Sequence, residues 1–366
     1  MPPRSVARTE QSAVSALGAA CQADASGPST STPARPTVLV LGATGFIGQA
    51  LVKRLRRDGL GVRALVRNTS QRAQLLAGQG VELAIGDMTD TPGIEAALAG
   101  IQHVYHLARS SGSTWEDYLR LDVEPTLCLA ELCCVRGIGL YYASSIAIYD
   151  GGRADDNITE STPPSRAAIR ISLYARAKVA NERLLDKMRR ERGLKVVVFR
   201  PGIVIGRGGN PCHPGVGTWA SSSLCHPWGD GHQRLPFVLV DDCADAMVRA
   251  LQVGGRAAES FNLVGEPCLS GNEYLDALER ISGSKIRRSR LPTWWLFARG
   301  AAKWGLQTLA RAPGRRMPSY RYIEGLSCRA AYRPDLAKQR LGWVPAADAA
   351  SLIERGIATA VAGAAA

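Results

Sequence analysis

The chain has 366 residues, of which 46% are hydrophobic, and its formal net charge at pH 7 is +13. This length allows a substantial buried core, whereas no apolar run approaches the roughly 20 residues that cross a bilayer. The nine cysteines are irregularly spaced, which is typical of a reducing cytoplasm and not of a disulfide framework. We therefore expect a cytoplasmic protein. Because no recognised motif accompanies the positive charge, nucleic acid is not expected as a partner.

Residues 1–36 are rich in Ala, Ser, Pro and Thr and lack the hydrophobic core of a signal peptide. We interpret them as a disordered leader, with an overlong start of the sequence as the alternative.

The first ordered element is expected to be an apolar strand at 37–41. It leads directly into the segment Gly42-Ala43-Thr44-Gly45-Phe46-Ile47-Gly48, which opens a helix. Glycine permits a tight turn and lets the backbone approach a pyrophosphate closely. The N-terminus of the helix presents free N–H groups and a positive dipole to the anion. This order of strand, glycine turn and helix predicts a dinucleotide-binding site.

Apolar strands alternate with helices through the first two hundred residues. Strands rich in Val, Ile and Leu, each followed by a helix, predict a doubly wound α/β fold whose parallel sheet is covered on both faces. Ligands of such sheets bind beyond the carboxyl ends of the strands. The expected strands are 37–41, 61–66, 81–85, 101–106, 138–144 and 195–200, and the expected helices lie near 46–58, 69–78, 92–99, 115–135 and 172–192.

From about residue 206 the pattern loosens into Gly, Pro, Cys and His, which indicates a smaller C-terminal lobe that covers the substrate. A later apolar run at 237–240 is expected to return to the sheet as a strand. We therefore expect a nucleotide-binding domain at 37–205, to which 236–265 returns. The substrate-binding lobe would then comprise 206–235 and 266–345, followed by a C-terminal tail or helix at 346–366.

Two Cys-His pairs in this lobe raise the question of a metal site. Adjacent residues on an extended chain point in opposite directions, so each pair is poorly placed to bind one ion. The paired spacing of zinc sites is also absent. We therefore expect no metal ligands in this lobe. We expect a loop that covers the substrate to contain Cys212, His213, Cys225, His226 and His232.

Three residues carry the expected chemistry. Ser145 lies at the end of the fifth strand, and Tyr174 and Lys178 are four residues apart near the start of a helix, so they share one face. An ammonium group beside a phenol favours the phenolate and lowers its pKa from about 10. Such a tyrosine exchanges a proton with an alcohol or a carbonyl while hydride moves to or from nicotinamide. The serine hydroxyl would orient the substrate oxygen.

With these motifs the chain resembles an extended short-chain dehydrogenase/reductase. This superfamily includes the NAD-dependent epimerase/dehydratase family, and the chain is most similar to its 3β-hydroxysteroid dehydrogenase-like branch. The resemblance extends from Thr37 to Pro345 and implies a Rossmann fold with a bound coenzyme. It assigns coenzyme contacts to Gly42, Thr44, Gly45, Phe46, Ile47, Gly48, Arg67, Asp87, Met88, Leu107, Ala108, Tyr174, Lys178, Arg200 and Pro201.

The chain departs from the family pattern at two positions. Asp122 stands where the family often has Asn, which favours a local structural role over a water relay. Arg67 follows the second strand, where NAD-binding members have an acidic residue. A carboxylate bonds the ribose 2′-hydroxyl, whereas arginine suits a 2′-phosphate. We therefore expect NADP as the coenzyme, with NAD as the alternative.

The residues after Ser145 distinguish between reactions of the family. Dehydratases place Asp-Glu after their catalytic threonine, whereas Ile146-Ala147 can act as neither acid nor base. The segment Arg200-Pro201-Gly202 resembles the steroid or flavonol reductase branch, and a bulky or lipid-like substrate is favoured by Trp219, Trp228 and Trp294. We expect oxidoreduction between an alcohol and a ketone on such a small-molecule substrate. Nucleotide-sugar epimerisation is the first alternative, and a non-catalytic dinucleotide-binding sensor or assembly factor is the second.

A basic tract follows in the C-terminal lobe. Ten Lys or Arg and no Asp or Glu lie between Lys285 and Arg321. Within this tract, tryptophan and leucine occupy much of a predicted helix. One face of this helix is mainly basic, because every fourth residue is polar or charged: Arg299, Lys303, Gln307 and Arg311. A helix with this pattern can pack on its own domain. Alternatively, residues 293–311 can contact a membrane surface. The resemblance further implies a homodimer.

Overall fold

The computed structural model describes residues 37–110, 112–149, 151, 157–254, 259–266, 269–310, 317–327 and 330–365. The leader expected at 1–36 lies outside these residues. Within the described part of the chain, the cysteines Cys128, Cys133, Cys134, Cys212, Cys225 and Cys243 are free thiols.

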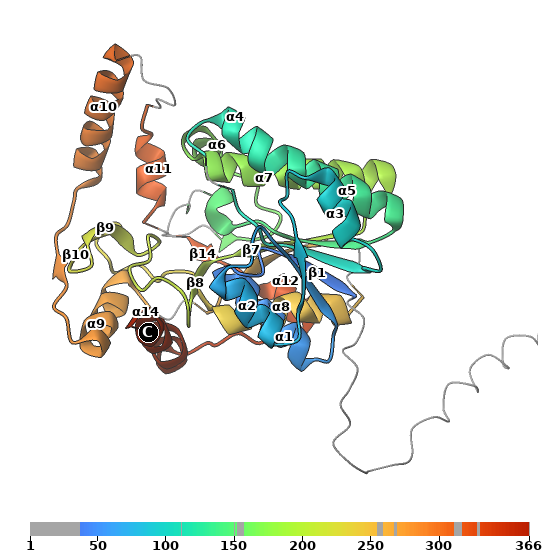
Figure 1. The fold of residues 1–366 in the computed structure, drawn as a ribbon. Helices are drawn as coiled ribbons and strands as arrows, with labels where there is room; N and C mark the ends of the chain where they lie inside the picture. Colours follow the sequence, from blue (N-terminus) through green and yellow to red (C-terminus); the bar gives the residue numbers. More distant parts are fainter. Residues whose placement is uncertain are drawn as a thin grey trace, which may run out of the picture. The chain divides into compact units, whose positions relative to one another are not determined.

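The centre of the fold is a sheet of seven parallel strands with the order β12-β7-β5-β4-β1-β2-β3. The direction in which successive strands are added reverses between β1 and β4, and a ligand crevice is expected at such a switch point. The predicted doubly wound α/β fold is confirmed (Figure 1). The strands are β1 (Val38–Leu41), β2 (Val62–Val66), β3 (Glu82–Ile85), β4 (His103–His106), β5 (Gly139–Ala143), β7 (Val196–Pro201) and β12 (Ser260–Leu263).

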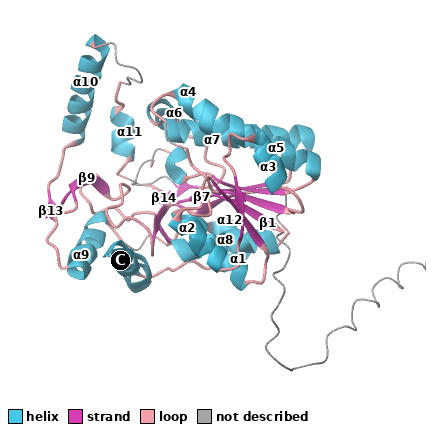
Figure 2. Ribbon diagram, in the orientation of Figure 1, coloured by secondary structure: helices cyan, strands magenta, loops and turns pink. Residues whose placement is uncertain are grey.

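Helices cover both faces of the sheet (Figure 2). In β1, Val38 and Val40 belong to one apolar cluster, whereas Leu39 and Leu41 belong to the other. This alternation places one cluster on each face, because successive side chains of a strand point to opposite sides. One face carries α1 (Phe46–Arg57), α2 (Gln71–Gly78), α8 (Val240–Gln252) and α12 (Asp335–Leu341), and the other carries α3 (Thr91–Ala97), α5 (Glu124–Arg136) and α7 (Leu173–Arg192).

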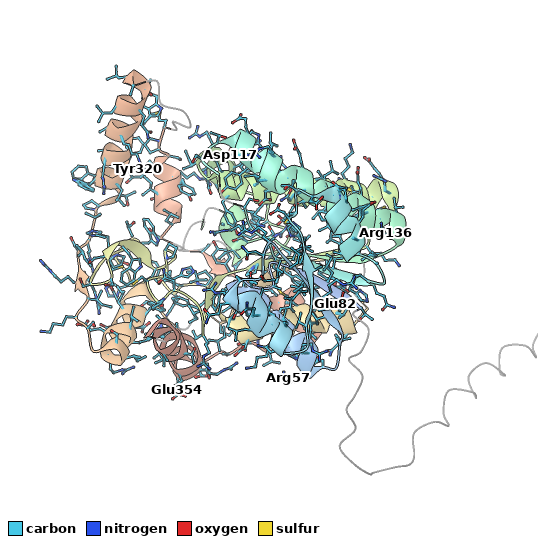
Figure 3. The ribbon with its side chains drawn as sticks, viewed as in Figure 1. Arg57, Glu82, Asp117, Arg136, Tyr320 and Glu354 are labelled. Atoms are coloured by element: carbon cyan, nitrogen blue, oxygen red, sulfur yellow. The ribbon has the colours of Figure 1, made fainter. Side chains whose placement is uncertain are left out.

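The helix expected at 115–135 is interrupted by a wider turn. It consists of α4 (Trp115–Tyr118), the π-helical segment η1 (Leu119–Val123) and α5, and Figure 3 labels Asp117 and Arg136 near its two ends. Thr114 and Asp117 form a capping box at the start. The π segment contains Asp122, and such segments often occur at functional sites.

The late strand expected at 237–240 does not join the main sheet. β11 (Phe237–Leu239) pairs instead with β8 (Ile203–Ile205) in a separate two-stranded sheet. The strand that extends the main sheet is β12, which pairs with β7. The chain turns away at Gly202, where an added Cβ would lie 2.2 Å from the carbonyl oxygen of Pro236, so the two short strands approach closely there.

The other described elements after residue 206 lie outside the main sheet and the helices that cover it. A three-stranded sheet and a helix pack against the C-terminal segment, which is helical, and share with it an apolar cluster that includes Leu275, Leu352 and Ile357. Among the described helices, none is long and apolar enough to span a bilayer. The elements are β9 (Gly217–Ser221), β10 (Leu224–Pro227), β13 (Arg287–Arg288), α9 (Gly271–Ser282), α10 (Thr293–Leu309), α11 (Tyr320–Gly325), α13 (Ala349–Ser351), η3 (Leu352–Ala358) and α14 (Thr359–Ala365). Four further short elements are η2 (Ile146–Ile148), α6 (Arg166–Ile171), and the paired strands β6 (Asn157–Ile158) and β14 (Ala331–Tyr332).

Candidate active site

The glycine turn lies at the carboxyl end of β1. Gly42 has φ +83°, and an added Cβ would lie 2.8 Å from the backbone nitrogen of Ala108. An added Cβ on Gly48 would lie 2.1 Å from the carbonyl oxygen of Gly42. Both contacts are with backbone, so a side chain at either position would force the turn open. The first glycine therefore permits the conformation, and the third permits close packing of α1 on β1.

The N-terminus of α1 is suited to an anion. Its N-cap is Gly45, no described side chain caps the helix, and its first turn contains no acidic residue. The unpaired N–H groups and the helix dipole favour a negative group at this position. The turn contains Thr44, Phe46 and Ile47, as the resemblance requires. These features fit the pyrophosphate of a dinucleotide.

Arg67 and Asp87 follow the neighbouring strands β2 and β3. The carboxylate of Asp87 accepts hydrogen bonds from the backbone N–H of Thr89 at 2.9 Å and from its hydroxyl at 2.8 Å. The bonds from Thr89 lower the pKa of Asp87, and the charge of Arg67 lowers it further. Arg67 is exposed and Met88 is half-buried. The two charged groups thus lie together at the edge where the adenosine half of a dinucleotide would end.

Leu107 and Ala108 follow β4 and lie against the glycine turn. The N–H of Leu107 donates to the carbonyl oxygen of Leu41 at 2.9 Å. His106, just before them, is buried, with Nε2 3.0 Å from the hydroxyl of Thr126. Burial, with a smaller effect of the charge of Lys178, lowers the pKa of His106 to about 3. His106 is therefore a neutral core residue at physiological pH.

Ser145 and Tyr174 come together at the end of β5. Their side chains lie close enough for Ser145 to lower the pKa of Tyr174. The Ser145 hydroxyl also accepts from the N–H of Ala147 at 3.1 Å. Ser172 caps the N-terminus of α7 and so positions Tyr174 in the first turn. The neighbouring Ser144 is buried instead, so Ser145 is the serine that faces Tyr174.

Lys178 does not act on Tyr174 as the sequence predicts. The ammonium nitrogen lies 5.8 Å from the centroid of the Tyr174 ring. It donates hydrogen bonds to the Tyr142 hydroxyl at 3.1 Å and to the carbonyl oxygen of Ala143 at 2.9 Å. Burial is the largest effect on Tyr174, and it raises the pKa above the ordinary value of a phenol. The prediction of a lowered pKa is therefore wrong for this structure, because desolvation outweighs the nearby cations.

A second cation, Arg109, also lies beside the Tyr174 ring. Its guanidinium carbon lies 5.7 Å from the centroid of the Tyr174 ring, and its charge lowers the pKa of that phenol. Sequence reasoning missed this residue. Its position directly after the segment His106-Leu107-Ala108, at the carboxyl end of β4, is the signal that would have found it.

Asp122 is part of a buried network behind the tyrosine. The amide of Asn181 donates to the Asp122 carboxylate at 2.6 Å and to the Tyr142 hydroxyl at 2.9 Å. The same hydroxyl accepts from Lys178. Burial lowers the pKa of Lys178, and the charge of Asp122 is the largest effect that opposes this. Asp122 therefore has the local structural role that we expected, and it also balances the charge of Lys178.

Arg200 is engaged by protein groups. Its guanidinium donates to both oxygens of Glu182 at 3.0 and 2.7 Å, to the Tyr149 hydroxyl at 2.7 Å and to the Glu160 carbonyl oxygen at 3.0 Å. These bonds leave it little capacity for a coenzyme. The coenzyme contact expected for Arg200 is thus not favoured by its geometry, and the contact expected for Pro201 stays a prediction.

The Cys-His pairs have protein partners. The ring nitrogen Nδ1 of His213 accepts from the N–H of Gly215 at 2.9 Å, and Nδ1 of His226 lies 2.8 Å from the Ser289 carbonyl oxygen. The indole N–H groups of Trp219 and Trp228 donate to the carbonyl oxygens of His213 and Pro214. In the described residues no group of three or more His, Cys, Asp or Glu is placed to hold a metal. Both tryptophans therefore hold the same segment, His213-Pro214, which precedes β9.

Comparison with known proteins gives the family. The model of the NAD dependent epimerase/dehydratase family matches residues 38–263. The 2-alkyl-3-oxoalkanoate reductase of Stenotrophomonas maltophilia is 25% identical over 318 residues, covering 84% of this chain and 94% of that protein. Sterol demethylase protein B of Methylococcus capsulatus is 27% identical over 333 residues, covering 87% and 96%. The solved structure of MoeE5 in complex with UDP-glucose and NAD has a TM-score of 0.65 and 25% identity, and the match covers 90% of this chain and 98% of that one. Because the family model matches more than half of the chain, this protein belongs to the NAD-dependent epimerase/dehydratase family of extended short-chain dehydrogenases/reductases.

Proposed function

We propose that the protein is an NAD(P)-dependent oxidoreductase that interconverts an alcohol and a ketone on a bulky, lipid-like substrate. The observation that carries the proposal is that Ser145 and Tyr174 lie beside each other at the end of the sheet where the glycine turn lies. A ketone oxygen placed between these two hydroxyl groups would be oriented and ready to receive a proton.

Three residues of the chain would then have separate roles in the reaction. Tyr174 donates its proton to the ketone oxygen in reduction and takes a proton from the alcohol in oxidation. Ser145 orients that oxygen, and Lys178 donates hydrogen bonds within the site. When bound, the nicotinamide coenzyme supplies or accepts the hydride at the carbon. Because the pKa of Tyr174 is raised, the phenol is protonated at neutral pH, as a proton donor for reduction must be.

One observation supports the type of reaction and another supports the substrate class. The residues after Ser145 are Ile146 and Ala147, which cannot catalyse elimination of water. Two relatives that match more than four fifths of the chain are named for a 2-alkyl-3-oxoalkanoate and for a sterol. Incubation with reduced coenzyme and either a 2-alkyl-3-oxoalkanoate or a sterol ketone tests the proposal, with loss of nicotinamide absorbance as the readout.

Replacing Tyr174 by Phe tests the assigned proton donor. We expect kcat to fall by roughly 100- to 10,000-fold while coenzyme affinity is kept, because the variant lacks only the hydroxyl. Tyr320→Phe is the matched control, since Tyr320 is exposed on α11. Full activity in Tyr174→Phe would contradict the mechanism.

We also propose that the coenzyme is NADP, because Arg67 occupies the position where NAD enzymes have an acidic residue. Arg67→Gln should raise the Kd for NADPH by roughly 10-fold or more while the Kd for NADH stays unchanged, because only the former has a 2′-phosphate. Arg57→Gln is the control, since Arg57 is exposed at the opposite end of α1. Equal losses for both coenzymes would exclude a role of Arg67 in selection.

Nucleotide-sugar epimerisation is the second candidate. It is favoured by the match to MoeE5 with bound UDP-glucose and NAD. An epimerase would convert a UDP-sugar without net coenzyme turnover, so the product and nicotinamide absorbance together separate the two reactions. Coenzyme binding without turnover of any alcohol, ketone or sugar nucleotide would instead favour a sensor or assembly factor. The expected homodimer is tested by light scattering of the purified protein.

A further inference from the structure

The helix α10 presents an apolar face that no described part of the chain covers. None of its residues is buried. Its exposed apolar positions recur at helical spacing, so they lie on one side. Trp294, Leu306 and Leu309 are 63%, 68% and 84% exposed. We call this side the outer face of α10, and it consists of Trp294, Trp295, Ala298, Ala302, Leu306 and Leu309.

The opposite side of α10 is already packed. Phe297 makes an edge-on ring contact with Tyr320 at 6.1 Å, and an added Cβ on Gly300 would lie 3.1 Å from Pro318. The helices α10 and α11 lie side by side (Figure 1), and Figure 3 labels Tyr320 at the start of α11. The outer face is therefore not the side by which α10 attaches to the protein.

Positive charge borders the outer face. Arg299 and Lys303 are exposed next to it, and the Arg299 guanidinium carbon lies 5.7 Å from the centroid of the Trp295 ring. The helix contains no Asp or Glu, and none occurs between Lys285 and Arg321. Of the basic face predicted from the sequence, Gln307 is half-buried and Arg311 lies outside the described residues.

We propose that α10 lies on an anionic lipid surface, with its outer face at the boundary between headgroups and acyl chains. Tryptophan side chains are favoured at that depth, and a helix with an apolar face and a basic border binds in the plane of the interface. The basic side chains pair with anionic headgroups. A second copy of the chain fits this surface poorly, because self-pairing would bring Arg299 and Lys303 of both copies together with no acidic residue in the helix to balance them.

The docked helix is connected to the active site through α11. The side chain of Tyr322 on α11 lies beside Ser172, which caps α7 two residues before Tyr174. The docked helix would therefore be linked to the catalytic helix α7 through α11. Delivery of substrate from the membrane rests on the proposed lipid-like substrate, whereas docking itself does not.

Vesicle co-sedimentation tests the proposal. The full chain should bind vesicles of phosphatidylcholine and phosphatidylglycerol at least 10-fold more tightly than pure phosphatidylcholine vesicles, and binding should weaken as salt rises. The double variant Leu306→Gln/Leu309→Gln should lose at least 10-fold in vesicle affinity, and Arg299→Gln/Lys303→Gln should lose the preference for anionic vesicles. The matched control is Val135→Gln/Val253→Gln, because both valines are exposed on other elements.

Coenzyme affinity, measured for every variant, shows whether the fold is kept. Unchanged vesicle binding by a folded Leu306→Gln/Leu309→Gln variant would overturn the proposal. So would a dimer that this substitution dissociates, since the outer face would then be an interface between copies. Vesicle binding without ketone reduction would leave docking intact and contradict only the proposed function. Reduction of a dispersed ketone without vesicle binding would contradict docking and leave the proposed function intact.

Discussion

The carboxylate of Asp122 acts on two residues of the proposed active site, Tyr174 and Lys178. It is buried, it accepts from Asn181 at 2.6 Å, and its charge raises the pKa of both Lys178 and Tyr174. A buried charge is costly unless it is paired and hydrogen-bonded. Asp122 and Lys178 therefore depend on each other, although they lie on different helical segments. We assign Asp122 as a positioning residue that sets the electrostatics of the site.

Asp122→Asn tests this assignment with almost no change in shape. Removing the negative charge lowers the pKa of Tyr174, so the ascending limb of kcat against pH for alcohol oxidation should move by about one pH unit toward lower pH. Asp186→Asn, at an exposed position of α7, should leave the limb unchanged. A lower Tm with an unmoved limb would indicate that Asp122 has a structural role alone.

Among the elements, we expect the packing of α1 on β1 to control binding of the proposed dinucleotide. Gly48 lies in the first turn of α1, where an added Cβ would lie 2.1 Å from the carbonyl oxygen of Gly42 and 2.8 Å from the Cα of Ala43. Replacement of a helical glycine by alanine ordinarily stabilises a helix by about 1 kcal/mol. Here the close backbone contact reverses the sign, because no flexible side chain can move aside.

Gly48→Ala should therefore weaken coenzyme binding by about 10-fold or more and lower the free energy of unfolding by about 1–3 kcal/mol. Gly78→Ala is the control, since Gly78 ends α2 and has open space around it. Coenzyme titration and urea unfolding measure the two effects. A Gly48→Ala variant as stable as its control would show that the glycine turn accommodates the added Cβ at little cost in stability.

At the scale of the whole molecule, buried histidines make the fold sensitive to acid. Burial lowers the pKa of His106 to about 3 and that of His213 to about 4, from an ordinary value of 6.5. The unfolded chain therefore takes up protons at a higher pH than the folded chain does. The free energy of unfolding should fall as pH drops from about 6.5 to about 4, by about 1.4 kcal/mol per pH unit for each histidine.

His213→Asn removes one of these titrations while its amide oxygen can still accept from the N–H of Gly215. Urea unfolding between pH 4 and pH 6.5 should then show a shallower loss of stability. His232→Asn is the control at an exposed position. Equal slopes in the two variants would mean that His213 does not contribute to acid unfolding.

Short stretches of the sequence are enough to predict the fold and those proposed site residues that lie close together in the chain. Apolar alternation predicts strands such as β1, the spacing of Gly42, Gly45 and Gly48 predicts the coenzyme turn, and Tyr174 and Lys178 share a helix face. Such patterns can be recognised in the sequence because each depends on backbone geometry within a few residues.

Which groups face one another becomes visible only in the folded chain. The tertiary structure brought Arg109 to the Tyr174 ring, joined Asp122 to Asn181 across 59 positions of sequence and engaged Arg200 with Glu182. It also decided that β12, and not the run at 237–240, extends the main sheet. These outcomes depend on burial and on contacts between distant segments. The raised pKa of Tyr174 follows from burial for the same reason, because desolvation is a property of the folded chain and not of its sequence neighbours.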